Sequence, residues 1–422
     1  MGRAGFQPLC AVAVMVSLVD PVACARPLPA PVHDPSLPSS AAAVPGTDQG
    51  FGYATVGGRG GATCHVVNLA ASGAGSLSDC VMNHDGPRTV VFDVAGTVVP
   101  DDVLRITSPF VTIDGTTAPA PGITIRPPSH DPGARPALVV ENTHDVIFRG
   151  LRLVGYNTGG DGDLVGLDGS EGGEVYNVVV DHLTLSQADD GALDVTGNVH
   201  DVTIAWSLLY GNALTSLIKY DTRQRISIHH SVYAHNGERN PQVKGDMRTL
   251  DFRNNIVYDW SLTRDGYGLR LWSAPSTDDS PGAPSINVVG NAFLSKEADS
   301  DCGIDLREDG PPVQRWVEDN IALPPPLCLA SNLAAPLAIP AAAQVTTTPS
   351  SSLGSVVLAN VGSHYRTAAE QALLDEVGQR LLTAQGWSRA ASGRTAAAVP
   401  SRSQNRPLSP ARTASAKQPV PR

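Results

Sequence analysis

The sequence lacks several features that would indicate a function at once. No apolar run reaches the roughly 20 residues that a membrane-spanning helix requires, so we expect no membrane contact. No CxxC pair or histidine–cysteine cluster is present, which argues against a zinc site. The net charge is −11, and such an acidic balance does not suit a nucleic-acid-binding protein. The seven positive charges of residues 388–422 leave about −18 on the rest of the chain.

Helical periodicity is scarce, whereas a strand-like pattern recurs between residues 145 and 293. Six nine-residue blocks each have apolar residues at their second and fourth positions and at their ends. Their starts are separated by 32, 24, 24, 24 and 36 residues. The blocks are DVIFRGLRL, NVVVDHLTL, DVTIAWSLL, RISIHHSVY, TLDFRNNIV and SINVVGNAF. Similarity at a nearly fixed spacing indicates a solenoid.

The alternation of apolar residues and the bordering Gly, Asn and Asp residues predict strands and turns rather than helices. Shorter runs lie between the blocks, namely DLVGL, ALDV, SLIKY and QVKGD, so each turn has at least two strands. Parallel pairing would place residue i beside residue i+24, which predicts an all-β parallel β-helix. An ordinary α/β domain would require long amphipathic crossover helices, and the sequence has none between these strands.

The remaining segments are predicted from composition. A short helix at 76–83 is expected to cap the first turn, and an amphipathic helix at 366–387 is expected to pack on the body. The glycine-rich FGYATVGGRGG has no P-loop lysine after it and is expected to form tight turns. The predicted organisation is a signal peptide (1–25), a disordered leader (26–49), the β-helix (50–323), a C-terminal extension (324–387) and a basic disordered tail (388–422).

Cysteine usage agrees with export from the cell. Two of the six cysteines fall in the expected signal peptide, and the remaining four allow three pairings. We favour Cys64–Cys80 and Cys302–Cys328, because the members of each pair are near in sequence and flank the repeats. Disulfides suit a secreted protein, which we expect to be a monomer.

Acidic residues recur at the turns of the predicted solenoid. Asp161 and Asp163 lie in the first long insertion, and Asp190 and Asp194 follow about one turn later. Stacked turns would gather these carboxylates on one face, where a cation such as Ca²⁺ would offset their repulsion. The alternative is that the Asp-Gly pairs only form turns.

Basic residues follow on the next turns. These are Lys219, Arg239 and Lys244. Carboxylates at one end of a groove and cations at the other suit an acidic polymer, whose own carboxylates would bind the metal and the basic groups. The alternative for Arg239 is a surface ion pair with Glu238 or Asp246.

Several motifs together resemble the extracellular pectate lyases of the pectate lyase superfamily. They are GSLSDCV…PRTVVFDVAGTV, TIDGTTAP, VVVDHLTLS…DDGALDV and HHSVYAHNGERNPQV…LDFRNNIVYDW, and they span about residues 51–293. The resemblance implies a right-handed parallel β-helix and Ca²⁺-dependent cleavage of polygalacturonate, the backbone of pectin, by β-elimination.

The resemblance also assigns roles to individual residues. It makes Asp161, Asp163, Asp190 and Asp194 calcium ligands and Arg239, which is followed two residues later by Pro241, the catalytic base. Asp181-His182 matches a hallmark pair, to which we assign a structural role.

Two positions depart from the family pattern. Lys244 stands where the family has a second arginine, and Leu214 stands where it has a substrate-binding lysine, for which Lys219 is the nearest substitute. Lysine keeps the charge but loses the two-pronged hydrogen bonding of a guanidinium group. Lys219 and Lys244 are therefore predicted to bind substrate.

Two other functions stay open at this point. A polygalacturonase-like hydrolase on the same fold would use carboxylates such as Asp189 and Asp190 with water and no metal. Alternatively, the solenoid would bind a polysaccharide without cleaving it.

Overall fold

The computed structural model describes residues 49–128, 136–158, 160–170, 172–219, 223–263, 266–296, 302–323 and 327–392, with side chains up to residue 386. The predicted signal peptide, all of the leader but its last residue, and the basic tail beyond residue 392 lie outside this range. Within the described residues, no helix has the length and apolar character needed to cross a membrane.

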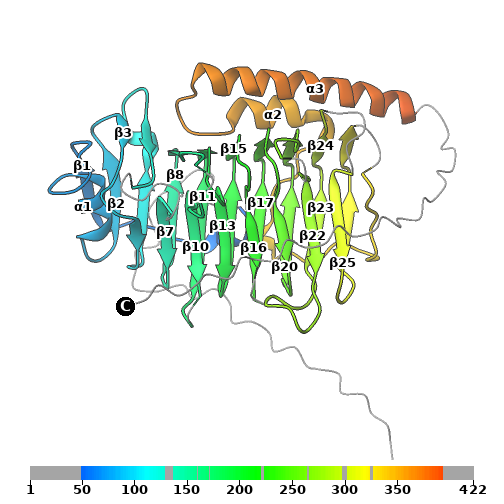
Figure 1. Ribbon diagram of the computed structural model, residues 1–422, viewed down its shortest axis with the longest axis horizontal. Coiled ribbons are helices and arrows are strands. Elements are labelled where there is room, and N and C mark those ends of the chain that lie inside the picture. The colour runs from blue at the N-terminus through cyan, green and yellow to red at the C-terminus, as the bar shows by residue number, and fades with distance from the viewer. Residues whose placement is uncertain are drawn as a thin grey trace, which may run out of the picture.

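The described chain forms a parallel β-helix with three sheets, which confirms the predicted fold class (Figure 1). Sheet A comprises β1 (Ala62–Val66), β2 (Arg88–Phe92), β5 (Val111–Asp114), β8 (His144–Arg149), β11 (Val175–Asp181), β14 (Val199–Ala205), β17 (Arg225–His229), β20 (Thr249–Arg253), β23 (Ser285–Val289) and β26 (Gln314–Glu318). Sheet B comprises β3 (Gly96–Val98), β6 (Ile123–Ile125), β9 (Arg152–Val154), β12 (Thr184–Ser186), β15 (Leu208–Tyr210), β18 (Val232–Ala234), β21 (Ile256–Tyr258), β24 (Ala292–Leu294) and β27 (Ile321–Leu323). Sheet C comprises β4 (Leu104–Ile106), β7 (Leu138–Glu141), β10 (Val165–Gly169), β13 (Leu193–Gly197), β16 (Leu217–Lys219), β19 (Gln242–Lys244), β22 (Leu269–Ser273) and β25 (Ile304–Glu308).

Each nine-residue block contains a sheet A strand, a sharp corner and a sheet B strand. The corner residue has a positive φ angle, as at His182 (55°), Trp206 (50°), His230 (52°) and Asn254 (57°). This left-handed conformation turns the chain within one residue, which is why the two strands share one sequence block. The pairing of Val178 with Val202, and of Val202 with Ile226, confirms the expected 24-residue register.

The interior is filled by columns of side chains that repeat from turn to turn. Val180, Ile204, Ile228 and Phe252 are fully or almost fully buried and occupy equivalent places on successive sheet A strands. Amides form a polar column at the corner between sheets A and B, where Asn255 Nδ2 donates to Asn291 Oδ1 at 3.2 Å and Asn291 Nδ2 donates to Asn320 Oδ1 at 2.9 Å. These columns pair buried polar groups without interrupting the apolar core.

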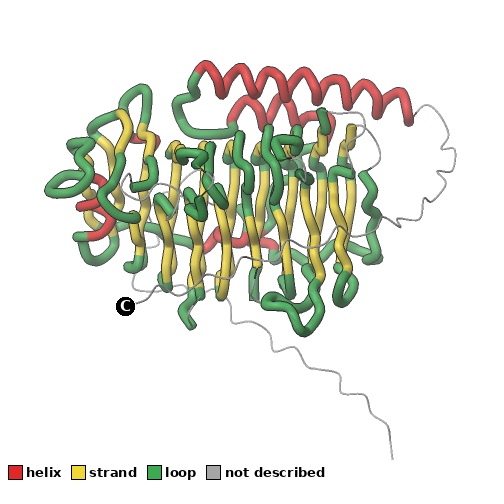
Figure 2. Tube along the Cα trace, viewed as in Figure 1, coloured by secondary structure: helices red, strands yellow, loops and turns green. Residues whose placement is uncertain are grey.

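Helices cap one end of the solenoid and cover one of its sides (Figures 1 and 2). Helix α1 (Leu77–Met82) packs at the first turns, and Ser76 caps its start by accepting a hydrogen bond from Asp79 N–H. Helices α2 (Leu353–Asn360) and α3 (Ala368–Ser392) pack on the outer face of sheet B through Val357, Val377 and Leu381. A buried ion pair between Arg152 Nε and Glu370 Oε1 at 2.8 Å also joins α3 to the body. The C-terminal helix was predicted, whereas α2 was not.

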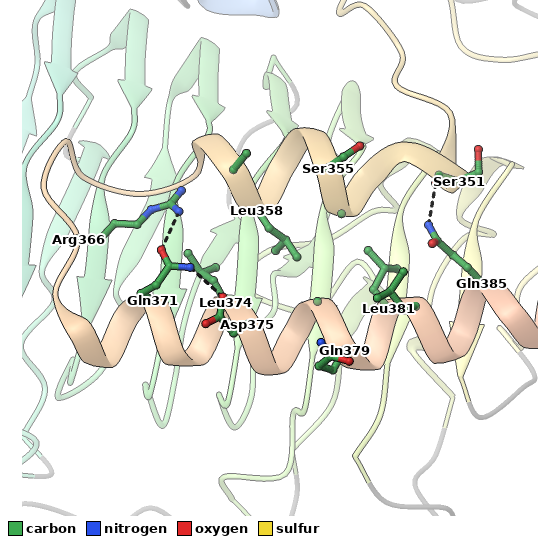
Figure 3. Close-up of a pocket in the computed structure, with 14 residues that line it drawn as sticks. Ser351, Ser355, Leu358, Arg366, Gln371, Leu374, Asp375, Gln379, Leu381 and Gln385 are labelled. Carbon is green, nitrogen blue, oxygen red and sulfur yellow. Dashed lines mark hydrogen bonds between the residues drawn. The ribbon is translucent and has the colours of Figure 1, made fainter.

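A groove of about 670 Å³ runs between α2 and α3 (Figure 3). Leu358 and Leu374 contribute apolar surface, and Gln371 donates to Asp375 Oδ1 at 2.9 Å along one wall. The groove lies on the helical side of the molecule and belongs to the packing of the two helices.

The glycine-rich segment that begins at Gly50 packs against sheet A. Phe51 N–H donates to Ser227 Oγ at 3.1 Å, and Gly52 N–H donates to Thr203 Oγ1 at 2.9 Å. A Cβ at Gly58 would lie 1.8 Å from the Arg88 carbonyl oxygen. These glycines therefore allow close packing of backbone on sheet, a requirement beyond the tight turns that were predicted.

Both predicted disulfides are present, and they fasten the two ends of the solenoid. Cys64–Cys80 joins β1 to α1, and Cys302–Cys328 joins the residues before β25 to those after β27.

Candidate active site

The candidate site lies where the chain passes from sheet B to sheet C on successive turns. Asp163 precedes β10, Asp190 precedes β13, Asp194 lies in β13 and Arg239 precedes β19. Because neighbouring parallel strands are about 4.8 Å apart, residues at this junction on different turns are brought together. The structure thus juxtaposes three of the four predicted acidic residues with the predicted base.

Gly191 organises the acidic residues. Its N–H donates to Asp163 Oδ1 at 2.8 Å, and its missing side chain leaves space for another carboxylate. A Cβ at this position would lie 2.3 Å from Asp194 Oδ1. Asp194 Oδ1 also accepts from Leu217 N–H at 2.8 Å, so backbone groups from two turns hold the two carboxylates.

This cluster, defined as Asp163, Asp190 and Asp194, is short of positive charge. Arg239 Nη1 contacts Asp190 Oδ1 at 3.1 Å and forms the ion pair of the cluster. Burial, followed by the negative charge of Asp190, raises the pKa of Asp163 to about 6 although Gly191 and Arg239 oppose the shift. Burial and the charge of Asp163 raise the pKa of Asp194 well above its ordinary value. An added cation would therefore lower the energy of the ionised cluster.

Arg239 reaches the cluster from two turns away, across the turn that contains β16. Its backbone is held in the left-handed region (φ 63°), and its carbonyl accepts from Ser216 N–H at 2.8 Å. Such a conformation costs on the order of 1 kcal/mol or more in a non-glycine residue and is common at functional sites. Its side chain is 21% exposed, so the guanidinium group is accessible from solvent.

Two further acidic residues in the same loops lie outside the cluster. Asp161 is exposed on the loop before Asp163. Asp189 is turned toward a different loop, where its Oδ1 accepts from Thr158 Oγ1 at 2.7 Å. Within the part of the chain that the structure describes, no three acidic, histidine or cysteine side chains form a ready-made metal site. The donor chemistry fits a hard cation such as Ca²⁺, but binding would require further convergence of the carboxylates or ligands from a substrate.

The two predicted substrate-binding lysines lie at the opposite ends of their strands from the cluster. Lys244 Nζ is 2.7 Å from Asp278 Oδ1 and 3.1 Å from Asp279 Oδ1, and Lys219 Nζ is 3.7 Å from Asp279 Oδ2. Leu214, in contrast, lies beside the site and forms a bridge to Glu238 on the next turn. Lys219 therefore adjoins Lys244 and does not occupy the place of Leu214.

The Asp181-His182 pair lies at the corner between sheets A and B. Asp181 is buried, accepting from Arg149 Nε at 3.0 Å and contacting His182 Nδ1 at 2.6 Å. These contacts link neighbouring turns at a corner away from the acidic cluster. They support the structural role expected for this pair.

Comparison with known proteins agrees with the resemblance to pectate lyases that the sequence motifs indicate. No family model matches the chain. The chain is 34% identical over 259 residues to a probable pectate lyase C of Aspergillus oryzae, covering 61% of this chain and 55% of the relative. It is 36% identical over 220 residues to a probable pectate lyase C of Emericella nidulans, covering 52% and 48%. Over these shared regions the chain is similar to pectate lyases.

The pectate lyase fold extends beyond these sequence relatives. The structure of Jun a 1, the major allergen of cedar pollen, matches with a TM-score of 0.61 at 17% identity, covering 75% of this chain and 92% of that one. A pectate lyase from Bacillus sp. N165, solved in complex with trigalacturonate, matches with a TM-score of 0.52 at 16% identity, covering 75% and 99%. At such identities the likeness concerns the fold. The chain spans about half the length of the curated relatives it matches.

The sequence analysis did not identify Gly191, Asp278 and Asp279 as parts of the site region. Gly191 stands between the two predicted acidic positions in DDGALD, where a required glycine was a readable signal. Asp278 and Asp279 belong to the second long insertion, which was noted only as extra residues between blocks. Their partners could not be read from the repeat, because an insertion has no counterpart on neighbouring turns.

Proposed function

We propose that the protein is a Ca²⁺-dependent pectate lyase that cleaves polygalacturonate by β-elimination. The observation that carries this proposal is the acidic cluster, whose buried and half-buried carboxylates are short of positive charge and adjoin the guanidinium group of Arg239. A polyanionic substrate would not bind beside such a cluster without a cation. The similarity to probable pectate lyases supports the same reaction.

In this proposal Asp163, Asp190 and Asp194 hold the metal ion, and the exposed Asp161 joins them when substrate is present. Carboxylate oxygens are the ligands that Ca²⁺ prefers in proteins. When bound, the ion would offset the charge of the cluster and of a uronate carboxylate, which would make the proton at C5 of the sugar more acidic.

Arg239 is proposed to remove that proton. The electron pair of the C5–H bond then forms a C4–C5 double bond as the C4–O bond breaks, and the leaving oxygen takes a proton from solvent. An arginine base must first lose a proton that a guanidinium group normally keeps. Positive charge at the cluster and competition for Asp190 would both favour that loss.

Lys219 and Lys244 are proposed to contact the polymer beyond the cleavage point, together with the aspartates that pair with them. The two disulfides support an extracellular location.

The decisive experiment is incubation of purified protein with polygalacturonate in the presence of Ca²⁺ or of a chelator. A lyase produces an unsaturated sugar end with ultraviolet absorbance, and we expect this product only with Ca²⁺. A hydrolase would raise the number of reducing ends without ultraviolet absorbance. A binding protein would retain the polymer in a pull-down assay and release no product.

A matched pair of variants locates the site. Asp190→Asn should abolish the Ca²⁺-dependent product, because it removes a ligand charge and the partner of Arg239. Asp85→Asn, an exposed change in the loop between α1 and β2, should leave it within about twofold. Equal losses in both variants would contradict the proposed site.

A further inference from the structure

A row of outward-facing residues crosses sheet C beside the candidate site. Lys244 pairs with Trp272 on β22, which pairs with Arg307 on β25, and Lys219 occupies the equivalent place on β16. Lys244 Nζ lies 4.6 Å and Arg307 Cζ lies 5.6 Å from the centroid of the Trp272 ring. We call Lys219, Lys244, Trp272 and Arg307 the basic row.

The charges of the two lysines are already balanced within the chain. Asp278 and Asp279 lie on the loop at 274–284. Lys244 Nζ is 2.7 Å from Asp278 and 3.1 Å from Asp279, and Lys219 Nζ is 3.7 Å from Asp279. The lysine side chains are only 19% and 12% exposed, whereas Asp279 is 60% exposed. Among the described residues, the two lysines and two aspartates balance one another, and the most exposed of these four charges is that of Asp279. Arg307, 45% exposed, adds a positive charge at the far end of the row, where it lies beside Asp305.

The loop is fixed by contacts that do not depend on these ion pairs. Ala274 and Gly282 exchange backbone hydrogen bonds of 2.8 and 2.9 Å, and Asp246 N–H donates to the Pro281 carbonyl at 2.9 Å. Close packing adds to this, because a Cβ at Gly245 would lie 2.4 Å from the buried Ser280 Oγ. The acidic residues are thus a permanent part of the surface.

A free uronate carboxylate gains little at such a surface. It would meet Lys244, whose ammonium group already contacts Asp278 and Asp279, and Lys219, whose ammonium group lies 3.7 Å from Asp279. It would also lie close to the exposed charge of Asp279. A methyl-esterified uronate has no charge to be repelled, and its ester methyl group can pack against the indole ring of Trp272. The electrostatic preference therefore favours the neutral sugar.

We propose that Asp278 and Asp279 are specificity-determining residues that make the basic row accept methyl-esterified rather than free galacturonate units. This inference rests on the proposed lyase function, and it names partially esterified pectin as the substrate class. The acidic cluster would take a free uronate at the cleavage point, while the neighbouring row takes an esterified one.

The test compares kcat/KM for polygalacturonate and for partially methyl-esterified pectin in the wild type, in Asp279→Asn and in the Asp278→Asn/Asp279→Asn double variant. Asp278 Oδ1 accepts from Ser280 N–H at 3.0 Å, and asparagine retains that acceptor, so the loop should persist. Releasing both lysines should shift selectivity toward polygalacturonate by about tenfold, the equivalent of about 1.4 kcal/mol. Glu318→Gln, which removes one negative charge from sheet A, is the control and should shift selectivity less than about twofold.

A shift smaller than about threefold in the double variant overturns the proposal, and a larger one supports it. If the double variant does not fold, Asp279→Asn carries the test with a threshold of about twofold, because its side chain is largely exposed. If the wild type releases no unsaturated product, the lyase proposal fails separately. Calorimetric titration with saturated galacturonate oligomers and their methyl esters then measures the same preference as a ratio of Kd values, judged by the same thresholds.

Discussion

Replacing Asp163 by asparagine should stabilise the protein in the absence of Ca²⁺, although it removes a proposed ligand. Burial raises the pKa of this carboxyl to about 6 from an ordinary value of 3.8. Each unit of difference corresponds to about 1.4 kcal/mol, so keeping Asp163 ionised in the folded state costs roughly 3 kcal/mol above pH 6. Asparagine avoids this cost and can still accept the hydrogen bond from Gly191 N–H.

The direction in which wild-type stability changes with pH follows from proton binding at Asp163. Between about pH 4 and pH 6 the folded state holds a proton at Asp163 that the unfolded state has lost, so wild-type stability falls as the pH rises through this window. Above the window the penalty is complete, and below it the penalty vanishes. Asp163→Asn should therefore exceed the wild type by roughly 4 °C in Tm at pH 8 without Ca²⁺ and should match it below pH 4.

Thermal unfolding at pH 4, 6 and 8, with chelator or with Ca²⁺, measures this effect. Calcium should raise the Tm of the wild type at pH 8, because a ligand that binds only the folded state adds about 2.7 kcal/mol at 100 times its Kd, and should act less on the variant. Asp161→Asn, on the exposed part of the same loop, is the control without Ca²⁺ and should change Tm by about 1 °C or less. The reasoning is refuted if Asp163→Asn is less stable than the wild type at pH 8 in chelator.

Three further predictions concern other parts of the molecule. If Arg239 is the base, Arg239→Lys should lower kcat by at least about tenfold with little change in KM, because a positioned base contributes typically 10² to 10⁴ in rate. Steady-state kinetics measures both constants, and Lys244→Ala, which should act mainly on KM, is the control. A loss of kcat below tenfold in Arg239→Lys contradicts the assignment. Glu370→Ala leaves Arg152 buried without its ion-pair partner, so it should destabilise the protein by about 3 to 5 kcal/mol in chemical denaturation or release α3 locally. If the α3 amides of the variant exchange hydrogen as slowly as those of the wild type, this prediction is wrong. Hydrogen bonds to Asp259 and Glu376 raise the pKa of His235. The contribution of His235 to holding α3 is therefore complete below the unfolded-state pKa and is lost as the pH rises through the folded-state pKa. Hydrogen exchange of α3 from pH 6 to pH 9 should show faster opening at high pH, and His235→Gln should remove this dependence.

The fold could be predicted because the sequence repeats at the length of one turn of the β-helix. The six blocks correspond to β8, β11, β14, β17, β20 and β23, each with the sheet B strand that follows it. Sheet B was not recognised as separate, because a single left-handed residue such as Trp206 forms the corner and leaves no gap in the pattern. Helix α2 was missed because LGSVVLAN shows little helical amphipathicity and is defined by its packing on sheet B.

The site could be predicted less completely than the fold. Asp163, Asp190, Asp194 and Arg239 fall near whole-turn offsets, so stacking the turns brought them together as expected. The exposed position of Asp161 and the outward turn of Asp189 depend on loop conformation, to which no repeat applies. The contacts of Lys219 and Lys244 depend on an insertion, and only coordinates could reveal them.

The stacking of the site across turns has a consequence for how such a protein can change. Asp190 and Arg239 belong to turns two strand spacings apart, and backbone hydrogen bonds hold each spacing at about 4.8 Å. Point substitutions can alter which groups stand at these positions, but they cannot lengthen the interval between them. A longer or shorter interval requires the gain or loss of a whole turn of about 24 residues, so distances along the β-helix axis change only in steps of one strand spacing. Evolution and engineering alike would adjust reach along a polymer in steps of one turn and adjust chemistry within a turn.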